Sequence, residues 1–153
     1  MTPGKKSPSL DLFITANSPG EIAGRVVPVV REIRSRVWSC RITLVILPCQ
    51  YASGEEISLG AESGADRCVR IGGLGELLDA DAGTDRAKRL LLHLGGDLFF
   101  SAYLSKRIGA PLWAYSSRPR WGRFVNFFFV PDEGSERRFA LLNFPPDRYE
   151  RIG

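Results

Sequence analysis

Residues 10–24 read LDLFITANSPGEIAG and contain the first strand, the first loop and the start of the first helix. Residues 10–15 form a short, largely apolar run, which predicts a buried strand. Residues 17–20 are turn formers, so the strand should end there in a loop. Beyond the loop, apolar residues recur at helical spacing, with charged residues available for the opposite face. The stretch therefore predicts a strand followed by a helix.

The helix expected over residues 22–37 contains an interior proline, Pro28. An interior proline removes a backbone hydrogen bond and clashes with the preceding turn, at a cost of about 3 kcal/mol. Either the regular helix begins close to Pro28, or the helix is kinked there.

Strand-like and helix-like segments alternate through the rest of the chain. Apolar or β-branched runs predict strands over residues 41–47, 66–71, 89–94, 111–115 and 126–130. Helical patterns cover residues 53–63, 98–108 and 133–143, and Gly109 stands in the C-cap position of the second of these. A glycine-rich turn at 72–75 leads into a loop or short helical piece at 76–85.

This alternation is typical of a parallel sheet built from right-handed crossovers. We therefore expect an α/β fold, a three-layer Rossmann-like parallel sheet with helices on both faces. In such sheets ligands bind at the carboxyl ends of the strands. The loops expected at that edge cover residues 17–21, 48–53, 72–75, 95–97 and 116–123.

The composition is that of an ordinary globular protein: 153 residues, 44% hydrophobic, 25% charged, with a net charge of +4. A chain of this length can bury a single core without disulfides or a structural metal. Cys40, Cys49, Cys68 and the single His93 have no metal-like spacing, so we expect no metal, no cofactor and a reducing compartment. Residues 1–9 are expected to be a disordered tail, and residues 10–153 one domain.

The charge and hydropathy patterns indicate whether the chain binds nucleic acid or crosses a membrane. The basic residues are spread along the chain, which argues against nucleic-acid binding. The longest uncharged run, residues 43–54, is well short of the roughly 20 residues needed to cross a bilayer. We therefore expect a cytoplasmic protein.

The first loop lacks the common phosphate-binding signatures, because Gly20 and Gly24 give only the spacing G-x-x-x-G. One interpretation is that Asn17, Ser18 and Glu21 hydrogen-bond to a polar ligand such as a sugar. The other is that Asn17 or Ser18 caps the turn and Glu21 complements the helix dipole.

Asp97 follows Gly95 and Gly96 after a predicted strand and precedes a predicted helix. A catalytic carboxylate of an α/β enzyme can occupy this place, and so can a helix N-cap. The two roles are compatible if capping uses one carboxylate oxygen. His93 falls within the strand, which favours a hydrogen-bonded core histidine over a general base.

Residues 116–129 read SSRPRWGRFVNFFF and combine arginines with aromatic residues. Arg118, Arg120 and Arg123 can bind a phosphate or an anionic lipid head group while exposed rings enter the acyl boundary. Alternatively, the arginines are simply solvated and residues 127–129 form a buried strand.

Four stretches, taken in order, resemble the N-terminal half of lipid-A-disaccharide synthase and its relatives: residues 14–24 (ITANSPGEIAG), 70–73 (RIGG), 93–97 (HLGGD) and 111–121. Those enzymes are glycosyltransferases of the GT-B fold. They join a UDP-linked acylated glucosamine to a second lipid-linked sugar and release UDP. The chain departs from the family's pattern at Arg25, where the family has an acidic residue, and in carrying the single aspartate Asp97 after the strand. These departures favour a related glycosyltransferase over the lipid-A reaction itself.

The resemblance implies a hexosyltransferase of lipid metabolism, related to lipid A biosynthesis, of which residues 10–153 supply the acceptor-side half. The UDP-sugar donor would bind a second half, missing here or separately encoded, so we expect the chain alone to be inactive. The acceptor would be a lipid-linked sugar, and the protein would contact the inner face of the membrane peripherally. The expected catalytic residue is Asp97, and the expected substrate-binding residues are Asn17, Ser18, Glu21, Gly72, Gly73, Gly95, Gly96, Arg118 and Arg120.

A hypothesis from another class remains open. The alternative is a non-catalytic Rossmann-like or flavodoxin-like module that binds a nucleotide or a partner protein. The absence of a phosphate fingerprint in the first loop argues against nucleotide binding. In favour of a free-standing module, the chain is long enough to form one sheet by itself.

Overall fold

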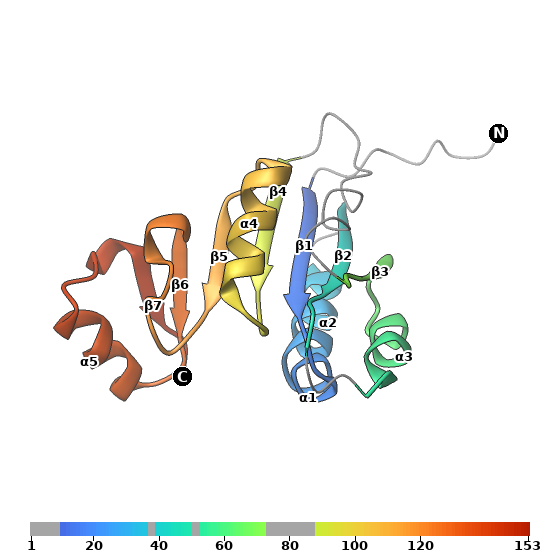
Figure 1. Ribbon diagram of the computed structural model, residues 1–153, viewed down its shortest axis with the longest axis horizontal. Coiled ribbons are helices and arrows are strands. Elements are labelled where there is room, and N and C mark those ends of the chain that lie inside the picture. Colours follow the sequence, from blue (N-terminus) through green and yellow to red (C-terminus); the bar gives the residue numbers. More distant parts are fainter. Residues whose placement is uncertain (1–9, 37–38, 50–52, 73–87) are drawn as a thin grey trace.

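Seven parallel strands form one sheet in the order β3-β2-β1-β4-β5-β6-β7, which Figure 1 shows from the green edge to the red edge. The computed structural model describes residues 10–36, 39–49, 53–72 and 88–153. The strands are β1 (Leu10–Ala16), β2 (Cys40–Ile46), β3 (Arg67–Arg70), β4 (Lys88–His93), β5 (Leu112–Tyr115), β6 (Phe127–Val130) and β7 (Tyr149–Arg151). The strand order reverses between β1 and β4, which pair directly. The predicted parallel α/β sheet is confirmed.

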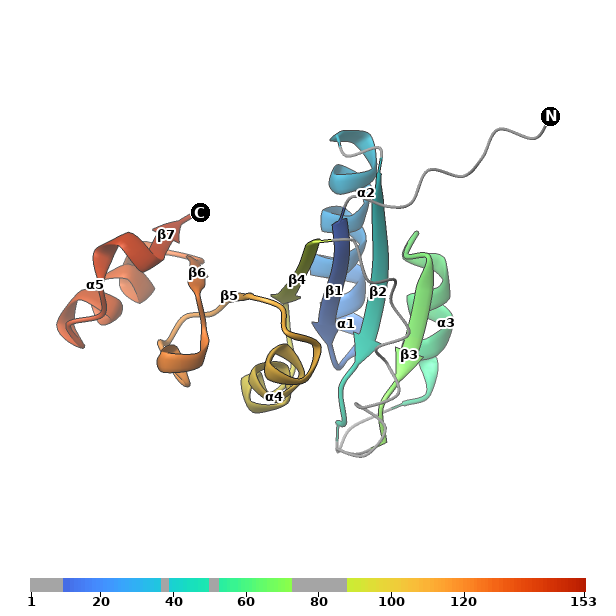
Figure 2. The ribbon, with the colours of Figure 1, turned by 90° about the horizontal axis from the view of Figure 1, so that it is seen from above.

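Helices pack on both faces of this sheet, as expected for a three-layer Rossmann-like fold. They are α1 (Pro19–Glu21), α2 (Val27–Arg36), α3 (Glu55–Glu62), α4 (Leu98–Ile108) and α5 (Glu133–Leu141). Figure 2 shows α2 and α3 beside strands β1 to β3, and α5 beside β6 and β7. The predicted tail at residues 1–9 and the predicted turn and loop at 72–85, apart from Gly72, lie outside the described residues.

Two hydrophobic clusters fill the space between the layers. Alternate residues of β1 point to opposite faces, so Phe13 belongs to the cluster under α4 and α5, and Ile14 to the cluster under α2 and α3. Phe128 and Phe139 are fully buried in the first cluster, with ring centroids 5.1 Å apart. Burying one such side chain contributes about 1.5–3 kcal/mol, so these alternating residues fix which helix covers which face.

A π-helical segment, Ile22–Val26, precedes α2. The backbone N–H of Val27 donates to the carbonyl of Ile22, five residues earlier, which makes a wider turn than that of an α-helix. The regular helix begins at Val27, one residue before Pro28. The expectation that regular helix begins close to Pro28 is confirmed, and the wider turn is the way in which the helix accommodates the proline.

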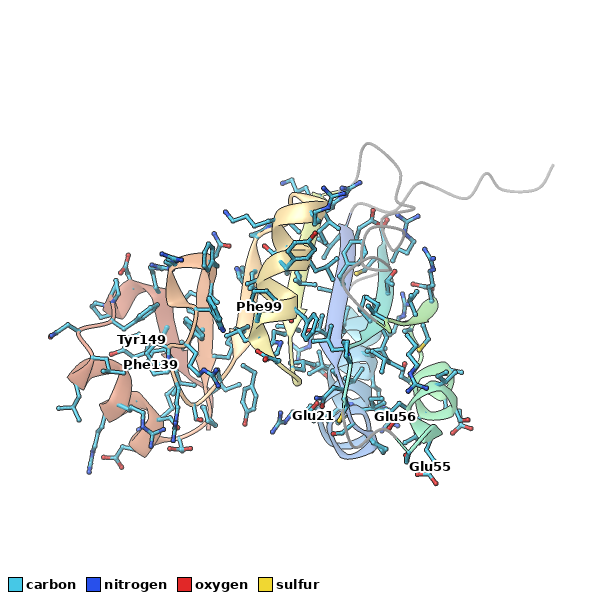
Figure 3. All side chains as sticks on the ribbon, viewed as in Figure 1. Glu21, Glu55, Glu56, Phe99, Phe139 and Tyr149 are labelled. Atoms are coloured by element: carbon cyan, nitrogen blue, oxygen red, sulfur yellow. The ribbon has the colours of Figure 1, made fainter. Side chains whose placement is uncertain are left out.

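Strand β7 was not predicted. Two of its three residues, Glu150 and Arg151, are charged and exposed, so the strand carries no apolar alternation. Its place at the sheet edge comes instead from pairing with β6 and from the packing of Tyr149 on Phe139, whose ring centroids lie 5.1 Å apart (Figure 3).

The phenylalanines of β6 do not share one environment. Phe128 is fully buried, but Phe127 and Phe129 lie on the opposite face, half-buried, and pack against Trp113 of β5. Trp113 is itself 39% exposed. The interpretation of residues 127–129 as a buried strand therefore holds for Phe128 and is wrong for its two neighbours, because successive residues of a strand alternate between faces.

Candidate functional site

The carboxyl ends of β1 and β4 lie side by side where the strand order reverses, and the loops that follow them carry most of the predicted site residues. In open α/β sheets this switch point is where ligands bind. Figure 3 shows Glu21 at the lower end of the sheet, the end toward which β1 points in Figure 1.

The Glu21 carboxylate connects these two loops. One oxygen, Oε2, accepts a hydrogen bond from the backbone N–H of Asn17 at 3.0 Å, and Oε1 accepts one from Gly96 at 3.3 Å. Ser18 caps the first helix by accepting from the backbone N–H of Glu21 at 3.3 Å. Bonds of this kind to an ionised group are about twice as strong as neutral ones. Glu21 and Ser18 thus have structural roles in the site.

The two glycines after β4 are required by the close approach of the first loop. A Cβ added at Gly95 would overlap the Glu21 carboxylate. Gly96 has φ = +86°, and a Cβ there would lie 3.2 Å from the Cβ of Asn17. Glycine is the residue that suits both a positive φ and close backbone contact.

Arg25 adds a second connection that the sequence did not indicate. Its Nη1 donates to the carbonyl oxygen of Leu94 at 2.7 Å and lies 3.6 Å from Oε1 of Glu21. The guanidinium also lies 5.1 Å from the ring centroid of Tyr115 in β5. Arg25 therefore ties the π-helical segment to β4 and β5, a role that only its place in that wider turn makes visible.

Asp97 is the N-cap of α4 and is exposed to solvent. Its Oδ1 accepts a hydrogen bond from the backbone N–H of Phe99 at 2.9 Å. The other carboxylate oxygen has no partner among the described residues. One oxygen is thus used for capping and one is left for a ligand, so the two roles weighed for Asp97 are compatible in this geometry.

His93, the last residue of β4, is 5% exposed and belongs to a buried polar cluster. Its Nδ1 lies 2.8 Å from the hydroxyl of Ser101 and 3.2 Å from that of Thr15, and the two hydroxyls are 2.8 Å apart. Burial lowers the pKa of His93 from 6.5 to about 4, and Asp97 opposes this shift while Arg25 adds to it. The imidazole is therefore neutral at pH 7.

The remaining predicted residues lie farther along the same sheet edge. Gly72 follows β3, which β2 and β1 separate from β4, and Gly73 lies outside the described residues. Arg118 and Arg120 stand exposed in the loop after β5, and their guanidinium groups have no partner among the described residues. Neither guanidinium forms a hydrogen bond or an ion pair with Asp97 in the described part of the chain.

An apolar surface connects that loop to the start of α4. The rings of Phe99 and Trp121 have centroids 5.5 Å apart, and each residue is 39% exposed. Trp121 has φ = +54°, an uncommon conformation for an aromatic residue. A cavity of about 210 Å³ lies between these elements, with Lys106 and Arg123 in its lining. The exposure of Phe99 was not predicted, whereas exposed rings in the stretch that contains Trp121 were one of the two interpretations of residues 116–129.

Comparison with known proteins identifies the fold. No known family and no curated protein matches the sequence. Among solved structures, the chain is similar to a protein described as a UDP-N-acetylglucosamine 2-epimerase from Listeria monocytogenes, with a TM-score of 0.62 and 12% sequence identity. The match covers 94% of this chain and 44% of the Listeria protein, so the chain spans less than half of its neighbour's length. The chain has the Rossmann-like α/β fold of one half of a GT-B-like protein.

No helix within the described ranges is both long and apolar enough to cross a membrane.

Replacing Gly95 with Ala should displace the Glu21 carboxylate and separate the two loops. We expect a loss of about 2 kcal/mol or more in the free energy of unfolding, because bonds to a charged group are lost. Gly20→Ala is the matched control, since a Cβ at Gly20 meets nothing within 4 Å. Urea denaturation of both variants measures the difference, and equal stabilities would contradict the role of Gly95.

The lowered pKa of His93 makes folding pH-dependent. Because the unfolded state binds a proton near pH 6.5 and the folded state near pH 4, this stabilisation is complete above pH 6.5 and is lost as pH falls toward 4. The shift corresponds to about 3 kcal/mol. Between pH 7 and pH 4, the free energy of unfolding of the native protein should fall by up to about 3 kcal/mol more than that of His93→Gln. Parallel stability curves from urea denaturation would refute this.

Proposed function

We propose that the chain is the acceptor-binding half of a GT-B-type glycosyltransferase, which transfers a hexosyl group from a UDP-sugar to a lipid-linked sugar. The observation that carries this proposal is Asp97: an exposed carboxylate, fixed by its cap to α4, with one oxygen left for a ligand at the switch point of the sheet. The fold shared with a nucleotide-sugar enzyme supports it.

In this reaction Asp97 acts as the general base. The free oxygen of Asp97 accepts the proton of the acceptor hydroxyl. At the same time, the oxygen of that hydroxyl attacks the anomeric carbon of the donor sugar. The new glycosidic bond forms as the bond from the anomeric carbon to UDP breaks, and UDP leaves with the electron pair. The cap from Asp97 Oδ1 to Phe99 fixes the carboxylate, so that little reorganisation is needed when the proton moves.

The surface beside Asp97 supports the proposal of a lipid-linked acceptor. Phe99 and Trp121 expose rings next to an apolar cavity, and Lys106 and Arg123 place positive charge at its wall. A ligand with a hydrocarbon part and an anionic head group is complementary to such a surface. Exposed Arg118 and Arg120 offer bidentate donors to a phosphate. We propose that this side of the protein contacts the membrane surface peripherally.

The donor would occupy a second α/β half. The chain covers 44% of its Listeria neighbour, so that protein has more than half of its residues beyond the matched region. We propose that an equivalent second half supplies the UDP-sugar site here, and that the chain by itself binds the acceptor without turning it over. Binding of UDP, but not of a phosphorylated glycolipid, to the purified chain would favour a nucleotide-binding module instead.

Asp97→Asn should separate catalysis from capping, because asparagine is an equally good N-cap. In the enzyme assembled with its donor half, we expect kcat to fall about 100-fold or more while KM for the acceptor changes little. Asp132→Asn is the matched control, since Asp132 also caps a helix, α5, and follows β6, two strands from β4. Steady-state kinetics of both variants test the role, and an unchanged kcat for Asp97→Asn would reject it.

Replacing both Arg118 and Arg120 with Gln should weaken binding of a phosphorylated glycolipid about tenfold or more, the loss expected for a charge-assisted hydrogen bond. The control replaces Arg31 and Arg107, also exposed, and so makes the same change in net charge elsewhere. Vesicles with and without the phosphorylated lipid give the two affinities. Equal losses in both double variants would point to bulk charge and against a phosphate site.

A further inference from the structure

The hydroxyl cluster around His93 determines which of its ring nitrogens carries the proton. Thr15 and Ser101 are both fully buried, and neither hydroxyl has a partner among the described residues outside the cluster. If Nδ1 carried the proton, it would donate to Ser101 and Ser101 to Thr15, leaving the Thr15 hydroxyl proton without an acceptor. An enclosed, unsatisfied donor costs about 1–3 kcal/mol.

The opposite arrangement satisfies every group of the cluster. Thr15 donates to the oxygen of Ser101 at 2.8 Å, and Ser101 donates to Nδ1 of His93 at 2.8 Å. The ring is neutral at pH 7, so its single proton then lies on Nε2. The cluster therefore fixes His93 as the Nε2–H tautomer.

The Nε2–H group is available to a ligand. It has no hydrogen-bond partner among the described residues. Among those residues, the one side-chain polar atom that is both fully enclosed and without a partner is Oδ1 of Asp11. The Nε2 atom of His93 is therefore not fully enclosed. His93 ends β4 at the switch point, four residues before Asp97, and Asp97 is the charged group that acts most strongly on it. The donor and the free carboxylate oxygen thus belong to the same edge of the sheet.

We propose that His93 is a further binding residue of this site, its Nε2–H donating to the oxygen of the ligand hydroxyl whose proton the Asp97 carboxylate accepts. A donor beside an acceptor is complementary to an alcohol group, which is both acceptor and donor. The negative charge of Asp97 disfavours a phosphate at the same place. The ligand group recognised here is a sugar hydroxyl, an assignment that rests on the proposed acceptor function. Thr15 and Ser101 are positioning residues, because they act on the ligand only through the imidazole.

The single histidine makes the test direct, because one imidazole gives the whole histidine signal. Two-dimensional ¹H–¹⁵N spectra of the purified chain at pH 7 should show a protonated Nε2 and an unprotonated Nδ1. Ser101→Ala and Thr15→Val should each keep the native tautomer, because the hydroxyl that remains still lies within hydrogen-bond distance of Nδ1. The double variant Thr15→Val/Ser101→Ala removes both donors and should introduce the Nδ1–H tautomer. A native protein with the proton on Nδ1 would overturn the inference whatever ligand binds.

Titration with N-acetylglucosamine and with inorganic phosphate tests the ligand class. The sugar should shift the Nε2 resonance of His93, and phosphate should leave it unchanged. His93→Leu should bind the sugar about tenfold more weakly than the native chain. His93→Gln keeps a hydrogen-bond donor and should recover part of the affinity. If the sugar shifts the amides of residues 17–21 and 95–97 but not Nε2, the role of His93 is wrong and the sugar site stands. If no signal of the site moves with sugar, the acceptor site is rejected and the role of His93 with it.

Discussion

The bridge made by the Glu21 carboxylate between the loops after β1 and β4 is the interaction on which the site depends. It joins the backbone of Asn17 to that of Gly96, across the point where the order of the strands reverses. The bridge lies directly against Gly95, so a side chain there would displace the carboxylate, and the loop after β4 leads from this contact to Asp97 at the start of α4. The position of the proposed base is thus set by a different carboxylate.

Much of the fold follows from the sequence, since the alternation of apolar strands and amphipathic helices predicts a parallel α/β sheet. Two features do not follow. The π-helical segment Ile22–Val26 is only five residues long, and over that length its apolar spacing cannot be told from that of an α-helix. In the sequence, only Pro28 marks the irregularity. Strand β7 contains Glu150 and Arg151 and is held by its neighbours, so its own residues carry no strand pattern.

The loops that hold the candidate site could be predicted, because carboxyl ends of parallel strands meet at one edge. The contacts within the site could not. Glu21 and Gly96 are 75 residues apart and Thr15 and Ser101 are 86 apart, and residue spacing along the chain carries no information on such pairs. The sequence favours a core role for His93, and the structure confirms its burial, but only the hydroxyl cluster shows which nitrogen is left over. The roles of Arg118 and Arg120 remain predictions.

The aromatic residues on the open side of β5 and β6 have a consequence for the life of the protein in the cell. Trp113, Phe127 and Phe129 form a ring cluster that the described helices leave partly exposed. Chaperones and proteases act on exposed apolar surface of this kind. The abundance of the chain should therefore depend on the apolar area that these rings leave exposed, through turnover as well as through stability.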